Sequence, residues 1–258
     1  MSFKKDAQAI RVVILVAALL ACAGCSPKPA LQTLSIAAAA DLQFALDDLA
    51  RGFRAAHPGV VLRISYGSSG NFFMQLQNQA PFDLFLSADV AYPRQLVQQG
   101  IGVKDSIFIY AVGRIAVWTP ARSPLDPKAA LESPALRHLA IANPQHAPYG
   151  RAAEAALRSL GVYDRVQSKL VLGENIAQTL EFVQSGAADA GVVALSLALA
   201  PAVRGQGRYW EIPLNAYPRM EQGGVIVKDS SAARAFRSWM LAPQGVRVLQ
   251  AYGFSLPK

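Results

Sequence analysis

Four short segments place hydroxyl, amide or carboxylate side chains where an apolar run gives way to an amphipathic pattern. They read Leu34-Ser-Ile-Ala-Ala-Ala-Ala-Asp41, Ile64-Ser-Tyr-Gly-Ser-Ser-Gly-Asn71, Ile141-Ala-Asn-Pro-Gln-His-Ala-Pro-Tyr-Gly150 and Leu170-Val-Leu-Gly-Glu-Asn-Ile176. Each is typical of a strand that ends where a helix begins. A helix N-terminus has unpaired backbone N–H groups and partial positive charge, so it can bind an anion. Because no charged side chain is common to the four, they predict a receptor that holds a small oxyanion with neutral donors.

The elements that must position these segments alternate along the chain. Apolar runs at 34–39, 60–66 and 82–88 predict strands, and helical spacing at 42–55, 71–78 and 92–98 predicts helices. The same scheme repeats from residue 114 onward. This alternation indicates βαβ units with parallel pairing and an α/β fold. No segment marks a clean domain boundary, and two lobes with a chain that crosses between them twice would fit the pattern.

The first 25 residues predict an export signal. Lys4, Lys5 and Arg11 precede an apolar run at 12–21, which small residues and Cys25 follow. The sequence Ala23-Gly-Cys-Ser26 resembles a bacterial lipobox, in which Cys25 would be lipidated. A second lipidation candidate is Cys22, and cleavage without lipidation would release the protein. Every alternative exports the chain to the periplasm, and residues 26–33 are predicted to be a tether.

Several functional classes lack their signatures here. The two cysteines lie in the leader, so the body has neither a thiol nucleophile nor a thiolate metal site. The three histidines have no metal-ligand spacing, and no nucleophile elbow, phosphate-binding loop or dinucleotide fingerprint is present. The net charge of +8 is scattered without aromatic interleaving, which argues against nucleic acid. We therefore expect no enzymatic activity and no cofactor.

The body resembles the periplasmic molybdate-binding proteins of ABC importers, which are type II periplasmic binding proteins. The resemblance covers about residues 34–254. It rests on Ala37-Ala-Ala-Ala-Asp-Leu42, Ser65-Tyr-Gly-Ser-Ser-Gly70, Ala80-Pro-Phe-Asp-Leu-Phe-Leu-Ser-Ala-Asp89 and Asn143-Pro-Gln-His-Ala-Pro-Tyr-Gly150. The segments Glu174-Asn-Ile176, Gly191-Val-Val193 and Tyr252-Gly-Phe254 follow in the same order.

This resemblance implies two lobes, each with a mostly parallel sheet flanked by helices, joined by two crossing strands. Lobe one would comprise residues 34–112 and 224–258, and lobe two residues 113–223. The oxyanion, molybdate or tungstate, would lie in the cleft between them. A membrane permease would be the partner, and we expect a monomer.

The resemblance also implies a ligand-binding set, which comprises Ala40, Asp41, Ser68, Ser69, Tyr149 and Ile176. Ser69 would donate its hydroxyl and backbone N–H, Tyr149 would meet the ligand at a helix start, and Ile176 would offer only a backbone N–H. The metal atom of the oxyanion would take no protein ligand. Ser68 would either cap its helix or contact the ligand. Ala194 stands where some members place a tyrosine hydroxyl, and we expect Tyr149 to supply that donor.

Asp41 departs from the family pattern, which has Ser or Asn at this position. Two interpretations remain open. The carboxylate could cap a helix by accepting from the N–H of Gln43 or Phe44, so that it turns away from the ligand. It could instead accept a hydrogen bond from a protonated anion such as hydrogen phosphate, which would make Asp41 the selectivity residue.

Other functions stay open at this point. A receptor for phosphate or sulfate is the nearest alternative. A secreted enzyme on the same fold and a sensor subunit that signals anion levels are further ones. Acidic residues that could dock a permease are Asp47, Asp48, Asp164 and Glu181.

Overall fold

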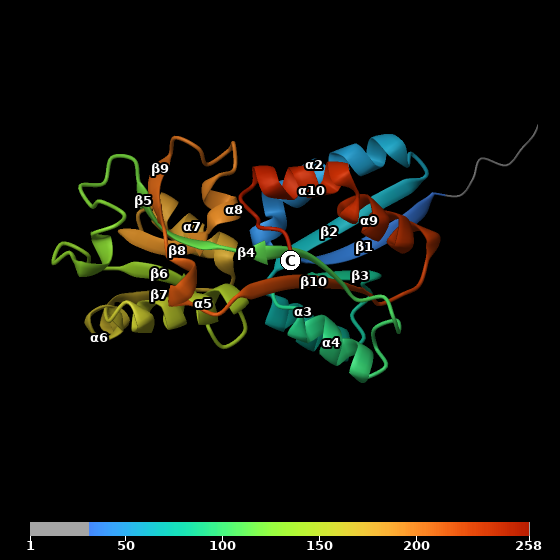
Figure 1. Cartoon of the computed structure of the whole chain (residues 1–258), viewed down its shortest axis with the longest axis horizontal. Coiled ribbons are helices and arrows are strands. Elements are labelled where there is room, and N and C mark those ends of the chain that lie inside the picture. Colours follow the sequence, from blue (N-terminus) through green and yellow to red (C-terminus); the bar gives the residue numbers. More distant parts are fainter. Residues whose placement is uncertain (1–30, 258) are drawn as a thin grey trace, which may run out of the picture. The chain divides into compact units, whose positions relative to one another are not determined.

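The computed structural model describes residues 31–257 (Figure 1). The predicted export signal, both candidate lipidation sites Cys22 and Cys25, and residues 26–30 of the tether lie outside the described residues. Within 31–257, no helix combines the length and the apolar character that crossing a membrane requires.

The first sheet has five strands in the order β2-β1-β3-β10-β4. Their bounds are β1 Gln32–Ala39, β2 Val60–Gly67, β3 Leu84–Ser87, β4 Phe108–Gly113 and β10 Met220–Ile226. Helices cover both faces (Figure 1), with α2 Gln43–Ala56, α9 Ser231–Leu241 and α10 Pro243–Ala251 on one and α3 Ser69–Gln77 and α4 Ala91–Gln98 on the other. Together these elements form lobe one.

The second sheet also has five strands, in the order β7-β6-β8-β5-β9. Their bounds are β5 Ile115–Pro120, β6 Leu139–Ala142, β7 Leu170–Gly173, β8 Ala190–Ala194 and β9 Gly207–Glu211. The helices of this part are α5 Pro148–Ser159, α6 Tyr163–Val166, α7 Ile176–Gln184 and α8 Leu195–Ala198. Single 3₁₀ turns at Ala40–Leu42, Ala130–Glu132, Gln167–Lys169 and Leu214–Ala216 complete the two lobes. We refer to this second group as lobe two.

The chain crosses between the sheets twice, as expected. It leaves β4 and enters β5 after Arg114, and it returns from β9 to β10. The expectation of mostly parallel sheets is wrong, because each sheet is mixed. In the first, β1 pairs in parallel with β2 and β3, whereas β10 is antiparallel to β3 and β4. In the second, β6 pairs in parallel with β7 and β8, whereas β5 is antiparallel to β8 and β9. The strands on the crossings run against the βαβ units.

Burial explains why the central strands carry near-continuous apolar runs. A parallel strand covered by helices on both faces has no solvent side. In β1, the side chains of Leu34, Ile36 and Ala38 are fully buried. The helices show the complementary pattern, since Leu46, Leu49 and Phe53 of α2 all face the core.

The four predicted junctions between strand and helix are confirmed. The chain passes from β1 through the 3₁₀ turn Ala40–Leu42 into α2, from β2 through Ser68 into α3, from β6 through a loop into α5, and from β7 through Glu174 and Asn175 into α7. These transitions bring the four junctions to one region between the lobes.

Candidate functional site

The junctions surround a small cavity between the two lobes. Its walls are formed by Ala39, Ala40, Asp41, Gly67, Ser68, Ser69, Ala88, Ala147, Pro148, Tyr149, Asn175 and Ile176. The structure therefore brings all six predicted ligand-binding residues together. The cavity measures about 10 Å³, which is room for roughly one water molecule. A larger guest requires the walls to separate slightly, and sugars or peptides are far too large.

Ser68 and Ser69 have different hydrogen bonds at the start of α3. The hydroxyl of Ser68 caps the helix, since its Oγ accepts from the N–H of Asn71 at 3.4 Å. The Oγ of Ser69 accepts from the N–H of Ala88 at 2.9 Å. The hydroxyl proton of buried Ser69 has no acceptor among residues 31–257, so it can be donated into the cavity.

The start of α7 leaves one N–H group free for a ligand. The side chain of Asn175 caps the helix, because its Oδ1 accepts from the N–H groups of Ala177 and Gln178 at 2.9 and 3.1 Å. The N–H of Ile176 has no partner within the described part of the chain. Since Ile176 lines the cavity, its backbone is the donor that its position predicts.

The start of α5 also leaves one backbone N–H group free for a ligand. Its first residue, Pro148, has no N–H, and the N–H groups of Gly150 and Arg151 both donate to the carbonyl of Ala147, at 3.0 and 3.2 Å. Over residues 31–257, the N–H of Tyr149 is left without an acceptor. By the same criterion, the hydroxyl proton of Ser68 and the N–H of Ser69 also have no acceptor within 31–257. Neutral donors without an acceptor, both hydroxyls and backbone N–H groups, thus lie on the cavity walls.

Asp41 does not cap a helix, which corrects one of its two interpretations. Neither the 3₁₀ turn nor α2 receives a side-chain cap at this end. The carboxylate is buried instead and accepts at Oδ2 from Tyr149 Oη at 2.9 Å and from Gln222 Nε2 at 2.6 Å. The other oxygen, Oδ1, has no partner within 31–257. Burial raises the pKa of Asp41 to about 6, against the opposing effect of the bonds from Gln222 and Tyr149.

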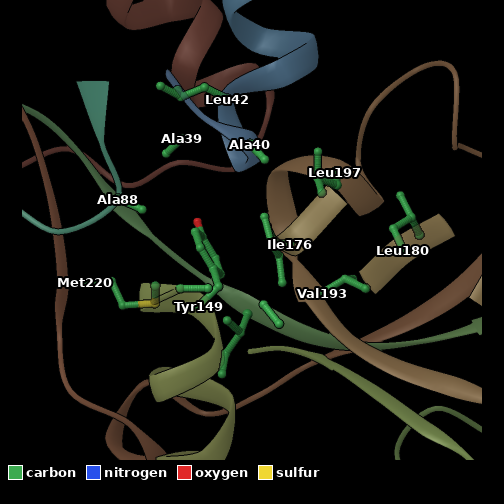
Figure 2. Close-up of a cluster of buried hydrophobic side chains, with 14 of the residues drawn as sticks. Ala39, Ala40, Leu42, Ala88, Tyr149, Ile176, Leu180, Val193, Leu197 and Met220 are labelled. Carbon is green, nitrogen blue, oxygen red and sulfur yellow. The ribbon is translucent and has the colours of Figure 1, made fainter. Parts of the chain in front are cut away.

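The expectation that the Tyr149 hydroxyl supplies the donor missing at Ala194 is wrong, because this hydroxyl is already engaged within the protein. Tyr149 is buried, and Figure 2 shows its hydroxyl directed from α5 toward the end of β1, where Ala39 and Ala40 lie. There the hydroxyl donates to Asp41 and accepts from Gln222 Nε2 at 3.0 Å. Burial, followed by the charge of Asp41, raises the pKa of Tyr149 well above its ordinary value, so the proton stays on this hydroxyl.

Two residues of this network were missed by sequence reasoning. Gln222 lies on β10, is fully buried and has an unpartnered Oε1 over the described residues. Ser196, at the start of α8, donates from Oγ to the carbonyl of Asp41 at 2.7 Å. The signal for Gln222 was an amide directly before Gly223 and Gly224, but the sequence predicts a strand only over 223–227, whereas β10 begins three residues earlier at Met220.

The lobes meet at the cavity rim through a backbone contact and an ion pair. The N–H of Gly70 in lobe one donates to the carbonyl of His146 in lobe two at 2.9 Å. Arg151 in lobe two pairs with Asp89 in lobe one at 2.9 Å. The structure therefore has its lobes closed on one another. Within 31–257, no group of three or more histidine, cysteine, aspartate or glutamate side chains is placed to hold a metal ion.

This fold and this cavity define a two-lobed binding protein with an anion-type site. The chain belongs to the bacterial extracellular solute-binding protein family, whose profile matches residues 34–255. The expected absence of enzymatic activity agrees with that family.

Individual relatives within this family have more specific descriptions. The chain is 38% identical over 249 residues to the molybdate-binding protein ModA of Azotobacter vinelandii, covering 95% of this chain and 96% of that protein. It is 30% identical to the putative ABC transporter substrate-binding lipoprotein YvgL of Bacillus subtilis, covering 98% of this chain and 99% of the relative. The solved periplasmic molybdate-binding protein of Azotobacter vinelandii superposes with a TM-score of 0.81 at 35% identity, covering 87% of this chain and 100% of that one. The resemblance to this group and the two-lobed α/β fold are thereby confirmed.

Proposed function

We propose that the protein is the receptor of an ABC importer for molybdate, and that tungstate binds at the same site. The observation that carries the proposal is the convergence of unpaired neutral donors on one small cavity. These donors include the Ser69 hydroxyl and the N–H groups of Tyr149 and Ile176. The molybdate-binding relatives support this choice of anion.

The donor set suits a fully deprotonated dianion. Molybdate near neutral pH can accept hydrogen bonds but has none to donate, so a ring of donors satisfies it. Each bond to a charged acceptor contributes about 1.5–3 kcal/mol. Backbone N–H groups at helix starts cannot shift far, so the cavity size would distinguish molybdate from the smaller sulfate. The molybdenum itself would be held only through its oxygens.

Delivery would follow from lobe opening and closure about the crossing strands. We propose lobe boundaries of 34–112 with 224–258 for lobe one and 113–223 for lobe two, so that the return crossing falls within β10, whose residues 220–223 already pair with β4 of lobe one. The exported chain would act in the periplasm as a monomer, lipidated at Cys25 or Cys22 or released, and would dock on a membrane permease. Of the four acidic candidates for docking, Asp47 and Asp48 already accept from Tyr66 and Tyr252, which leaves Asp164 and Glu181 as the stronger ones.

A receptor for hydrogen phosphate is the second candidate, and the unpartnered Oδ1 of Asp41 favours it. An ionised carboxylate accepts a hydrogen bond from a protonated anion. It repels a fully deprotonated one by about 4 kcal/mol for each unit of ligand charge at about 4 Å and an effective dielectric of 20. Hydrogen phosphate would bring its own proton to the carboxylate of Asp41, whereas molybdate would have none to donate there.

Thermal unfolding of the purified protein with molybdate, tungstate, sulfate and phosphate, each added separately, tests the function. A ligand at about 1,000 times its dissociation constant stabilises the folded state by about 4 kcal/mol. We expect molybdate and tungstate to raise the melting temperature by several degrees, and sulfate to have little effect. A shift with phosphate alone would favour the second candidate. No shift with any of the four anions would contradict an oxyanion receptor.

A further inference from the structure

The carboxyl group of Asp41 has one oxygen fully engaged and one free. Tyr149 and Gln222 both donate to Oδ2. Oδ1 is buried and has no hydrogen-bond partner over residues 31–257; the backbone N–H of Asp41 itself acts on the carboxylate only as the smallest of the effects that lower its pKa. Buried polar atoms are nearly always paired, so an unpaired one calls for a partner. Asp41 lines the cavity, where an oxyanion would supply that partner.

The cavity offers nothing to neutralise an ionised Asp41. Among the described residues on its walls, none is lysine, arginine or histidine. A charge buried without an opposite charge is strongly disfavoured, and a dianion beside it makes the arrangement worse. A dianion without protons also cannot donate to Oδ1. The pairing becomes favourable only when Oδ1 itself carries a proton.

We propose that Asp41 binds the oxyanion as a neutral carboxylic acid that donates its Oδ1 proton to a ligand oxygen. This inference rests on the proposed function. When Asp41 is ionised in the free protein, the proton comes from solvent, so one proton is taken up with each dianion. Tyr149 and Gln222 act as positioning residues, because their bonds to Oδ2 leave Oδ1 as the oxygen to be protonated.

The burial of Asp41 makes this protonation accessible near neutral pH. Its pKa in the structure is about 6, and a bound dianion raises that pKa further. Affinity should therefore be greatest below pH 6 and should fall as the pH rises above it, by about tenfold for each pH unit, since one proton is involved.

The two tyrosines that interact with Asp41 do not offer the same titration, and the ring of His146 at the cavity rim contacts Glu174 instead. Tyr110 on β4 and Tyr149 on α5 couple to Asp41, but burial raises the pKa of both well above the ordinary tyrosine value, so they remain neutral. Charged side chains on the elements that pack around Asp41 have other partners or face solvent. On α2, Asp47 accepts from Tyr66 and Asp48 accepts from Tyr252. Arg151 of α5 pairs with Asp89, Glu221 of β10 pairs with Arg219, and Glu181 of α7 is exposed.

The test is the dissociation constant of molybdate measured by calorimetric titration at several pH values between 6 and 8. For the wild-type protein we expect the constant to rise by about 50-fold over this range, since Asp41 is already half ionised at pH 6. Titrations at pH 8 in two buffers with different protonation enthalpies should report uptake of about one proton. In Asp41→Asn, the amide oxygen would take the place of Oδ2, which accepts two hydrogen bonds, and the amide N–H₂ would take the place of Oδ1. The affinity of this variant for molybdate should therefore be independent of pH and should exceed that of the wild type at pH 8.

Glu132→Gln, which removes an exposed carboxylate on the 3₁₀ turn Ala130–Glu132, is the control and should keep the wild-type profile. A wild-type dissociation constant that does not change with pH, with no proton uptake, would overturn the inference and leave the proposed function standing. The same holds if Asp41→Asn follows the wild-type profile. Failure of molybdate to bind at every pH would instead overturn the proposed function and, with it, this inference.

Discussion

Replacing Gly70 with alanine is expected to weaken molybdate binding by about 10- to 100-fold without impairing folding. A Cβ on Gly70 would lie 2.4 Å from the carbonyl oxygen of His146 and 2.9 Å from its Cα, both in the backbone of the opposite lobe. Overpacking of this kind costs about 1–3 kcal/mol, or about one to two orders of magnitude in affinity. The lobes would have to stay further apart, which would move Ser69 of lobe one away from the donors of lobe two.

Gly70 lies within α3, where alanine is the better helix former by about 1 kcal/mol. Lobe one alone should therefore not be destabilised. The matched control is Gly59→Ala, because a Cβ at Gly59 meets nothing within 4 Å. The two measurements are calorimetric affinity for molybdate and urea unfolding without ligand. Undiminished affinity of Gly70→Ala would show that the closed arrangement of the structure is not the binding arrangement.

Replacing Ser69 with alanine is the second large effect we expect, again a loss of about 10- to 100-fold in affinity. The substitution removes a hydroxyl whose proton has no acceptor among residues 31–257, and a hydrogen bond to a charged acceptor contributes about 1.5–3 kcal/mol. It also takes the acceptor from the N–H of Ala88, which Ser69 Oγ holds at 2.9 Å. Affinity and unfolding free energy should be measured on the same preparation.

The neighbouring Ser68 provides the matched control. Ser68→Ala removes the side-chain acceptor of the Asn71 N–H and should lower the unfolding free energy by about 0.5–2 kcal/mol, with a smaller loss of affinity than Ser69→Ala. Ile176→Val keeps the backbone N–H and should bind nearly as well as the wild type. If Ser68→Ala lost more affinity than Ser69→Ala, the two hydroxyls would have been assigned the wrong roles.

The helix starts could be predicted from the sequence because their signals are local. An apolar run followed by serine, asparagine or proline marks a strand end and a cap within a few residues. These signals were sufficient to predict the four junctions, whereas the choice of Ser69, Tyr149 and Ile176 within them came from the resemblance to the molybdate-binding proteins. The residue type of Ile176 was sufficient to predict that it would offer only its backbone, since an apolar side chain has no donor.

The partners of Asp41 could not be predicted in the same way. Tyr149 is 108 residues away in sequence and Gln222 is 181 residues away, so no local rule joins them. Capping is the common role of aspartate before a helix, but here a buried tyrosine and a buried glutamine compete successfully for the carboxylate. A tertiary network thus overrides a local preference.

The prediction of mostly parallel strand pairing was wrong for a related reason. The periodicity of β4, β9 and β10 carries no information about which neighbour each strand joins. In the structure β10 inserts between β3 and β4, and its antiparallel pairing is set by a chain that comes back from the other sheet. The edge strand β9 is not predicted from the sequence, because none of its residues is fully buried and its alternation is weak.

Anomalous diffraction at the molybdenum edge, from crystals of the protein grown with molybdate, tests the central claim most directly. We predict a single strong peak in the cavity between the lobes, with ligand oxygens at hydrogen-bond distance from Ser69 Oγ and from the N–H groups of Tyr149 and Ile176. A peak elsewhere on the protein, or no peak in this cavity at saturating molybdate, would contradict the assignment of the site.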